Sequence, residues 1–469
     1  MSSVIVFITI DCLRYDYANY LTKIIPKGWE SLIFSNFYAC GPYTWASFPG
    51  IFTSTYPFTL NSLKSQSIYN RLSFVQILSK GGYVTIGNSG GNPHLSASHG
   101  YNKGFRYFVD YIGKAQSSRR RVPNIHFVKS CFRKIIRKLP RKSQIIIGTL
   151  YSLGNLWLGY KPYPDASYVI KDTLNILYEE ISKKRHDKFF IWAHIMDLHV
   201  PCSFILNYIH NLKSFRDLFK LYLITHGIYD WDIEFLRSIK EYYEKSLLYV
   251  ISTLRSMLDL LDSSYDNVYV IITSDHGEEF GEHNAIGHAG LAHLGVHFTH
   301  LYEELLHVPL IITGKELAVK GLNTVFCSHL DIAPTILSLA DINRKSKYYK
   351  RLIKRLFIGK NLLSDSSSES RYLVSESEAI LVSSPFSLTY GLGNAYALRK
   401  DGYKYIWHPY LGEELYDLNS DPAETINLIE EMPDVVKEFR VSLRNYLERK
   451  RRFIAIYKVL FKLFKRCVV

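Results

Sequence analysis

The sequence predicts an α/β protein in which a doubly wound, mostly parallel sheet is flanked by helices and followed by a small C-terminal α+β subdomain. Continuous apolar runs, which are typical of strands buried on both faces, occur at 4–10, 83–86, 189–193 and 268–272. Stretches with helical periodicity lie between these runs, at 71–80, 166–183 and 241–261. Alternating strands and helices indicate a parallel sheet covered on both faces. Strand-like pieces of the C-terminal subdomain follow at 371–375, 395–399 and 403–408.

Changes of composition divide the chain. Its 469 residues suffice for one large α/β domain with appendages. We expect a main domain at 1–344 with a basic insertion at about 115–160, then a Lys/Arg-rich and Ser-rich linker at 345–372. The small subdomain is expected at 373–432, and residues 433–469 are predicted to form a basic amphipathic C-terminal helix or tail.

Composition excludes several classes of protein. Hydrophobic residues make up 47% and charged residues 21%, which is ordinary for a folded soluble chain and excludes disordered and collagen-like proteins. The net charge of +14 favours an anionic substrate or partner. Because the six cysteines are far apart and form no CxxC pair, we expect reduced, mostly buried thiols in place of a disulfide scaffold or a cysteine zinc site.

The N-terminus has no basic leader, and its short β-branched run predicts a first strand and not a signal peptide. No uncharged run reaches the ~20 residues that span a bilayer, so the expected location is the cytoplasm. Residues 119–142 and 449–466 combine Lys/Arg with apolar residues at helical spacing and contain no acid. Such helices either pack on the body with solvated basic faces or attach the protein peripherally to an anionic membrane.

Polar clusters follow three of the predicted strands. Asp11 ends the first strand, the segment from His194 to His199 follows the third, and Asp275 and His276 follow the fourth. In a doubly wound sheet, ligands bind beyond the carboxyl ends of the strands. A carboxylate beside an imidazole at such an end suits a divalent cation, although a structural Asp-His pair has the same appearance.

Further strings occur in a fixed order around these clusters. They are GPYTWASFP at 41–49, SDHGEEFGEH at 274–283, LYEELLHVPLII at 301–312, DIAPT at 331–335, ELYDL at 414–418 and DPAE at 421–424. Together they resemble the sulfatase family of the alkaline phosphatase superfamily, from about Val4 to Leu428. The resemblance implies the superfamily's sheet and a catalytic role for the main domain, as an enzyme acting on sulfuric or phosphoric esters.

The resemblance also implies a metal site. Asp11, Asp275 and His276 match metal-binding positions of the family, and Thr44 would complete the set. Family members usually carry two acids at the end of the first strand, but the second position here is Cys12. A thiol weakens the hard-oxygen character of a calcium site and favours manganese or zinc, unless Cys12 is a packed thiol. The expected cofactor is one divalent ion, Mn, Ca, Mg or Zn.

The nucleophile string departs from the family pattern Cys(or Ser)-x-Pro-Ser-Arg, whose first residue becomes formylglycine. Thr44 occupies that first position and cannot give the aldehyde, and Phe48 replaces the arginine. We therefore expect no formylglycine. Thr at this place resembles phosphotransferase and phosphodiesterase relatives, the phosphoglycerol and phosphoethanolamine transferases and nucleotide phosphodiesterases, in which a metal-activated Thr hydroxyl attacks phosphorus. The alternative is a turn residue in an inactive protein.

Histidines supply the remaining candidates. The segment at 194–201 resembles the family's H-x-x-D-x-H-x-P string, in which His199 matches a substrate-contacting histidine that could protonate the leaving group. His194 is a candidate for substrate binding, for a structural role, or for a second metal site together with Asp197. His297 and His300, upstream of the LYEE string, are candidates for contacting the anion. Asn92 and His94 are weaker candidates for the pocket lining.

The sequence therefore predicts a metal-dependent hydrolase or transferase of a phosphate or sulfate ester, with Thr44 as nucleophile and Thr44 and His199 as the catalytic residues. The rival interpretation is a catalytically inactive protein of the same fold that binds an anionic membrane surface or polyanion through its basic stretches. A nucleic-acid partner has only bulk charge in its favour and no groove-reading motif, so none is expected.

Overall fold

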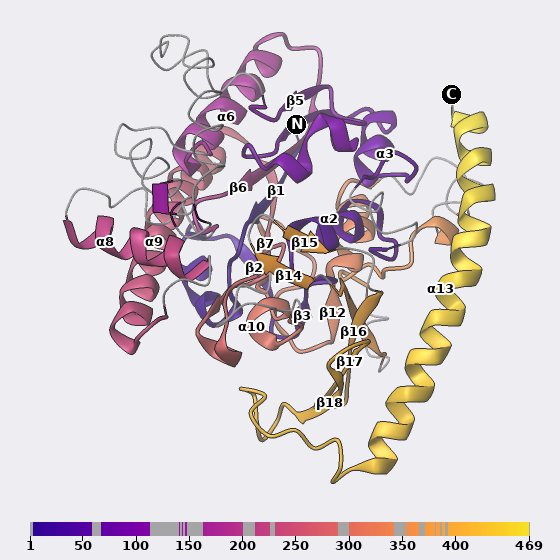
Figure 1. The fold of residues 1–469 in the computed structure, drawn as a ribbon. Coiled ribbons are helices and arrows are strands. Elements are labelled where there is room, and N and C mark those ends of the chain that lie inside the picture. The colour runs from indigo at the N-terminus through magenta and orange to yellow at the C-terminus, as the bar shows by residue number, and fades with distance from the viewer. Residues whose placement is uncertain are drawn as a thin grey trace.

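The computed structural model describes residues 3–58, 67–112, 163–199, 212–225, 230–288, 300–341, 354–364, 371–379, 381–384, 387–389 and 393–468, with a few isolated positions. Among them, eight strands form the main sheet in the order β11-β2-β10-β7-β1-β6-β4-β5 (Figure 1). Their bounds are β1 Ser3–Ile10, β2 Glu30–Phe34, β4 Val84–Asn88, β5 Tyr107–Val109, β6 Lys188–Ile195, β7 Asn267–Ser274, β10 Leu310–Gly314 and β11 Gly321–Asn323. β1 pairs in parallel with β6 and β7, whereas β10 runs antiparallel to β7 and β2. The predicted mostly parallel sheet is confirmed.

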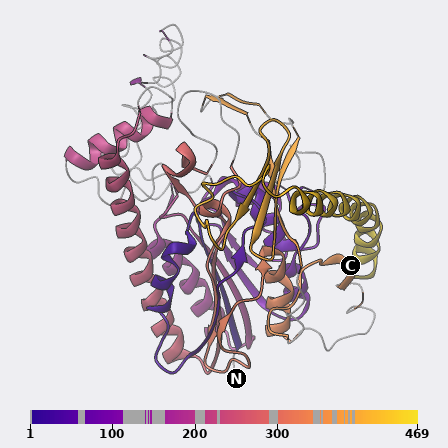
Figure 2. The same cartoon turned by 90° about the horizontal axis from the view of Figure 1, so that it is seen from below.

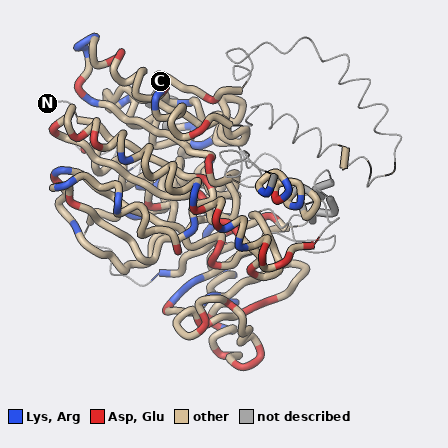
Figure 3. The backbone as a smooth tube through the Cα atoms, turned by 90° about the vertical axis from the view of Figure 1, so that its left-hand side faces the viewer, with Lys and Arg blue, Asp and Glu red and all other residues tan. Residues whose placement is uncertain are grey.

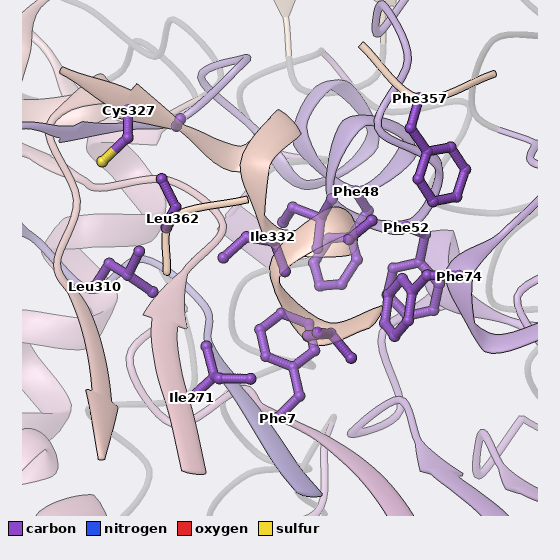
Figure 4. Close-up of a cluster of buried hydrophobic side chains, with 14 of the residues drawn as sticks. Phe7, Phe48, Phe52, Phe74, Ile271, Leu310, Cys327, Ile332, Phe357 and Leu362 are labelled. Carbon is purple, nitrogen blue, oxygen red and sulfur yellow. The ribbon is translucent and has the colours of Figure 1, made fainter. Parts of the chain in front are cut away.

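Alternate residues of β1 enter two separate cores. Val4, Val6 and Ile8 belong to a cluster with α6 (Ala166–Ser182) and α9 (Ile233–Ser264) on one face of the sheet. Ile5 and Phe7 belong to the cluster on the other face, with α2 (Thr44–Thr53), α3 (Phe74–Lys80) and α11 (Ile332–Leu339). Figure 2 shows helices on both sides of the sheet, and Figure 4 shows Phe7 beneath aromatic residues of α2. A strand covered twice needs apolar residues at every position, which explains the continuous apolar run.

Two helices differ in length from the prediction, and capping explains both differences. α3 begins at Phe74, not Arg71, because Ser73 and Gln76 form a reciprocal capping box. α9 begins at Ile233, not Glu241, because the Asp232 side chain accepts a hydrogen bond from the backbone N–H of Phe235.

A small antiparallel sheet follows in the order β13-β16-β17-β18, which agrees with the predicted C-terminal subdomain. Its strands are β13 Leu373–Glu378, β16 Asn394–Lys400, β17 Tyr403–His408 and β18 Gly412–Asp417, and the helix α13 (Pro433–Val468) comes after them. The shorter elements are η1 Tyr15–Tyr17, α1 Asn19–Thr22, β3 Phe37–Tyr38, η3 Pro93–Leu95, η4 Ala97–His99, α8 Leu212–Thr225, β8 Glu279–Phe280, η5 Glu282–Asn284, β9 Ile286–Gly287, α10 Glu303–Leu306, β12 Cys327–Ser328, η6 His329–Asp331, β14 Leu381–Ser384 and β15 Ser387–Thr389. The domain limits stay a prediction, and the basic stretch 119–142 lies outside the described residues apart from Pro140.

Helix α13 lies along the side of the body (Figure 1). Tyr446, Lys450, Tyr457 and Phe461 are buried at helical spacing on its inner face. Lys450 is paired with buried Glu376 of β13 at 2.7 Å, and the Tyr457 hydroxyl accepts a hydrogen bond from the backbone N–H of Leu72. Within the described part of the chain, no helix combines the length and apolarity needed to cross a bilayer.

A buried charge network joins the C-terminal sheet to the main domain. Glu303, in the LYEE string, contacts Arg399 at 2.6 Å and Lys404 at 3.0 Å, and both of these cationic side chains are fully buried. Lys404 also pairs with buried Glu424 of the DPAE string at 2.6 Å. Burial alone would raise the pKa of Glu303, but Arg399 and Lys404 hold it well below its usual value. These buried ion pairs therefore join the LYEE string of the main domain to the C-terminal sheet and the DPAE string.

Replacing Glu303 by Gln removes the carboxylate that pairs with buried Arg399 and leaves buried Lys404 with Glu424 alone. We expect Glu303→Gln to lower the free energy of unfolding by about 3–5 kcal/mol, the usual cost of removing one partner of a buried pair, as measured by urea unfolding. Asp259→Asn, which removes an exposed pair with Arg255, is the matched control and should leave stability nearly unchanged. Equal stability of the two variants would contradict the anchoring role of Glu303.

Candidate active site

Four side chains named by the sequence motifs converge at the carboxyl ends of β1 and β7. Asp11 follows β1, Asp275 and His276 follow β7, and Thr44 opens α2. Thr44 Oγ1 lies 3.5 Å from Asp11 Oδ2 and 3.4 Å from His276 Nε2. His276 Nε2 lies 3.5 Å from Asp11 Oδ1 and 3.5 Å from Asp275 Oδ2. Parallel pairing of β1 with β7 places Asp11 beside Asp275 and His276.

The loop before Thr44 is fixed by the C-terminal sheet. In β13, the Ser375 hydroxyl donates to the carbonyl of Ala39 at 2.6 Å, and the Glu376 N–H donates to the carbonyl of Cys40 at 2.9 Å. Gly41 has no room for a side chain, because a Cβ there would lie 2.3 Å from Ala46 Cβ. Thr44 therefore begins a helix whose preceding loop is hydrogen-bonded to β13 and has no space for a side chain at Gly41.

Asp11 and Asp275 bring two carboxylates close together in the protein interior, which is electrostatically unfavourable when both are charged. Both are fully buried. Burial alone would raise the pKa of Asp11, but His199, His194 and His276 hold it well below its usual value. Burial, and then repulsion by Asp11, raises the pKa of Asp275 well above its usual value. The site thus holds one carboxylate charge readily and a second only at a cost.

His194 orients Asp11 from beneath. Thr9 Oγ1 accepts a hydrogen bond from Trp192 Nε1 at 3.1 Å, which leaves its own proton for His194 Nδ1 at 2.9 Å. His194 Nε2–H then donates to Asp11 Oδ2 at 3.1 Å, where Asn92 Nδ2 also donates at 3.2 Å. Both ring nitrogens of His194 are engaged and the residue is fully buried. This geometry suits the structural role among those left open by the sequence.

Two further histidines, His199 and His288, lie next to His276. The His199 ring centroid is 5.1 Å from that of His288, which is 4.3 Å from that of His276. Burial lowers the pKa of His199, while Asp11 opposes that shift. Burial also acts to lower the pKa of His288, but buried Glu278, 3.2 Å from its Nδ1, raises it overall.

The remaining candidates have other partners or lie outside the described residues. His300 Nδ1 is paired with buried Glu279 at 2.8 Å, and His297 lies outside the described residues. His94 packs on Trp45, the neighbour of Thr44, with ring centroids 4.7 Å apart, and burial lowers its pKa to about 4. Asp197 is buried in the turn after β6.

Phe48 stands in the core where the family pattern has arginine. It is fully buried among Phe52, Tyr101 and Trp192, and its ring meets the His194 ring edge-on at 5.1 Å. The position therefore gives no charge to the site. It supports the histidine that orients Asp11.

Comparison with known proteins places this geometry in a family. The model of the sulfatase family matches residues 3–342, which include Asp11, Thr44, Asp275 and His276. The chain belongs to the sulfatase family. Solved structures agree on the fold: phosphonate monoester hydrolases of Agrobacterium radiobacter and Silicibacter pomeroyi superpose with TM-scores of 0.61 and 0.62. Both are 16% identical, over 96% of this chain and 96% and 95% of theirs.

Curated relatives of this sulfatase-family chain match over part of their length. The uncharacterized sulfatase YidJ of Escherichia coli (strain K12) is 28% identical over 193 residues, 40% of this chain and 33% of that protein. Arylsulfatase K of Xenopus laevis is 25% identical over 221 residues, 45% of this chain and 38% of that protein. The matches thus span about a third of the first relative and somewhat more of the second.

Sequence reasoning did not select three contributors to this sulfatase-family site. His288 and Glu278 face each other across the turn formed by β8 and β9, and the single signal was the crowding of histidines between 283 and 300. The clamp by β13 had no sequence signal, because its hydrogen bonds join residues more than 330 positions apart.

The donor set fits a divalent cation. One oxygen each of Asp11 and Asp275 and a ring nitrogen of His276 lie within 4.8 Å of one another, and all three residues are buried. Asp275 Oδ2 has no hydrogen-bond donor of good geometry in the described part of the chain. A cation would compensate both charges, and oxygen and nitrogen donors suit the ions expected from the sequence.

A bound cation should therefore stabilise the protein. At 100 times its dissociation constant the ion adds about 2.7 kcal/mol to the free energy of unfolding, seen as a rise in the thermal unfolding midpoint after chelator treatment and ion addition. Asp275→Asn should lose most of that rise, whereas Asp266→Asn, an exposed control next to β7, should keep it. A full rise in Asp275→Asn would exclude this residue from the site.

Proposed function

We propose that this protein is a metal-dependent hydrolase of a phosphate or sulfate ester, with the Thr44 hydroxyl as nucleophile. The observation that carries the proposal is the position of Thr44 Oγ1, 3.5 Å from Asp11 and 3.4 Å from His276. Family membership supports ester hydrolysis. The names of the structural neighbours, phosphonate monoester hydrolases, support an anionic phosphorus or sulfur centre as the target.

A divalent cation, when bound, would neutralise ester charge and increase the acidity of the hydroxyl. Thr44 Oγ attacks the phosphorus or sulfur atom, its proton passes to Asp11 Oδ2, a covalent ester forms on Oγ, and the bond to the oxygen of the leaving alcohol breaks. His199 is our candidate donor of a proton to that leaving oxygen, because a half-buried imidazole near the site can hold and release one. Water then attacks the Thr44 ester and gives one proton back to His199, the bond to Thr44 Oγ breaks, and the proton held by Asp11 restores the hydroxyl.

His194 and Asn92 act through Asp11 in this scheme. Their hydrogen bonds to Asp11 Oδ2 fix the carboxylate plane and leave Oδ1 directed toward His276. We therefore assign both as positioning residues. A preorganised carboxylate avoids reorganisation during the reaction, which is the main source of electrostatic catalysis.

A substrate panel tests the proposal. The purified full chain, with and without added divalent ions, would be assayed with p-nitrophenyl phosphate, bis-p-nitrophenyl phosphate, p-nitrophenyl phenylphosphonate and p-nitrophenyl sulfate. Ion-dependent turnover of at least one ester is expected. Glycerol as a second acceptor separates hydrolysis from transfer, because transfer yields a glycerol ester at the expense of the inorganic ion. Absence of turnover with every ester and ion would refute the proposal.

Loss of the nucleophile has a distinct signature. Thr44→Ala should lower turnover on the order of 10³-fold or more, whereas Thr44→Ser, which keeps a hydroxyl, should retain part of it. Thr53→Ala is a matched control, because Thr53 lies in the same helix and its hydroxyl contacts the carbonyl of Pro49 and the hydroxyl of Thr55, neither of which belongs to the site. A rate in Thr44→Ala close to the native rate would rule out covalent catalysis by this residue.

A second function, docking on an anionic membrane surface, is favoured by the outer face of α13. Ile456, Val459 and Leu463 are 57%, 59% and 41% exposed and lie along one stripe of the helix. Exposed Arg452, Lys458 and Lys462 flank them. The predicted apolar stripe at 449–466 is therefore divided, since Phe453 and Leu460 pack against the body.

The excess positive charge of the chain is concentrated in two segments. Residues 119–142 and 449–466 together hold eighteen of the 57 Lys and Arg and none of the 43 Asp and Glu, so the rest of the chain has more acids than bases. Figure 3 shows basic and acidic positions intermixed over the described backbone. Each basic residue near an anionic bilayer adds about 1 kcal/mol, so we propose that the stripe docks reversibly there.

Vesicle sedimentation tests the docking. Ile456→Ser with Val459→Ser should reduce binding to vesicles rich in phosphatidylserine several-fold. High salt should release the native protein, because screening weakens the attraction. Val441→Ser, also exposed on α13 but before the basic region, should bind like the native protein. No binding of the native protein at low salt would contradict docking.

A further inference from the structure

We propose that Cys12 and His288 are ligands of the active-site cation and that they select Zn²⁺ over Ca²⁺ and Mg²⁺. The Cys12 sulfur and one ring nitrogen each of His276 and His288 lie within 4.8 Å of one another. His276 also belongs to the group formed with Asp11 and Asp275. The two groups share His276, and we infer that together they form one cation site with sulfur, nitrogen and oxygen donors. The inference rests on the cation of the proposed function.

Cys12 is held in an unusual backbone conformation that aims its thiol into the site. Its φ of 62° lies in the left-handed region, which a non-glycine residue seldom adopts without compensation. Tyr243 supplies that compensation: its hydroxyl donates to the carbonyl of Cys12 at 2.8 Å and accepts from the N–H of Arg14 at 3.1 Å. Cys12 Sγ lies 3.0 Å from Asp11 Oδ1 and 3.7 Å from His288 Nδ1.

His288 has the partner that a metal-binding histidine usually has. Its Nδ1 lies 3.2 Å from both carboxylate oxygens of Glu278, which is fully buried. When Nδ1–H donates to this carboxylate, Nε2 keeps its lone pair. A carboxylate behind a ligating histidine fixes the tautomer and makes the ring a stronger donor.

The donor types favour zinc, and the spacing of the donors is compatible with it. Ligand bonds of about 2.0–2.3 Å in a tetrahedron place neighbouring donor atoms roughly 3.3–3.6 Å apart. His276 Nε2 lies 3.5 Å from an oxygen of Asp11 and 3.5 Å from an oxygen of Asp275. Ca²⁺ takes six to eight oxygens, whereas thiolate and imidazole are the donors that zinc prefers.

A different buried cysteine shows what a merely packed thiol does here. Cys327 is also free and buried, but its sulfur faces the backbone carbonyl of Asn36 at 3.5 Å. Cys12, in contrast, contacts a carboxylate and an imidazole. Cys327 therefore supplies a matched control for the experiment.

The test measures metal binding without substrate. The full chain is stripped of metal with a chelator and titrated with Co²⁺, which substitutes for zinc and gives a near-ultraviolet thiolate-to-cobalt charge-transfer band. Calorimetry then gives the affinities for Zn²⁺ and Ca²⁺. We expect the band in the native protein and at least 100-fold tighter binding of Zn²⁺ than of Ca²⁺. Cobalt binding without the band, or equal affinities for the two ions, would overturn the proposal.

Variants assign the ligands. Cys12→Asp should abolish the band, weaken the binding of Zn²⁺ at least 10-fold and strengthen the binding of Ca²⁺. Cys12→Ser should also abolish the band, and it replaces the aspartate variant if that variant does not fold. His288→Ala should weaken Zn²⁺ about 10- to 100-fold, and Cys327→Ser should keep band and affinity. A band that persists without Cys12, or native Zn²⁺ affinity without His288, refutes that residue as a ligand. Ester turnover is scored separately, so a band without turnover defeats only the proposed function, and turnover without a band defeats only the zinc site.

Discussion

Two carboxylates are buried side by side where neighbouring strands end, and the arrangement of the surrounding side chains follows from their charge. Asp11 and Asp275 are both fully buried, and repulsion by Asp11 adds to burial in raising the pKa of Asp275. The histidine and amide beneath Asp11, the imidazole of His276 and the hydroxyl of Thr44 all direct polar atoms at this pair. A protein without a function for the pair would gain stability by replacing it with apolar residues.

The sequence predicted those features that depend on local pattern. Continuous apolar runs located β1, β4, β6 and β7, because a strand covered on both faces has no polar position. The ends of these runs located Asp11, Asp275 and His276, since parallel strands end at one edge of the sheet. The resemblance of the ordered sequence strings to the sulfatase family pointed to Thr44.

Long-range contacts explain what the sequence could not predict. Nothing in the string from His194 to His199 distinguishes the histidine that faces Asp11 from the one that faces His288. That difference comes from Thr9 of the neighbouring strand β1, which contacts His194 Nδ1 and accepts a hydrogen bond from Trp192 of β6. Likewise, the split of the apolar positions on α13 into an inner and an outer face depends on where the body lies.

The contacts of β13 with the loop before Thr44 bear on what counts as the smallest working unit. The family match ends at residue 342, yet Ser375 and Glu376 shape the loop that presents the hydroxyl. A fragment that stopped at the end of the match would keep every proposed ligand and lose the scaffold of its nucleophile. Residues 354–364, which lie between these two parts, are held in place as well, because Leu356, Phe357 and Leu362 are buried in the core that also contains α2. The smallest working unit is therefore the matched region together with this segment and β13.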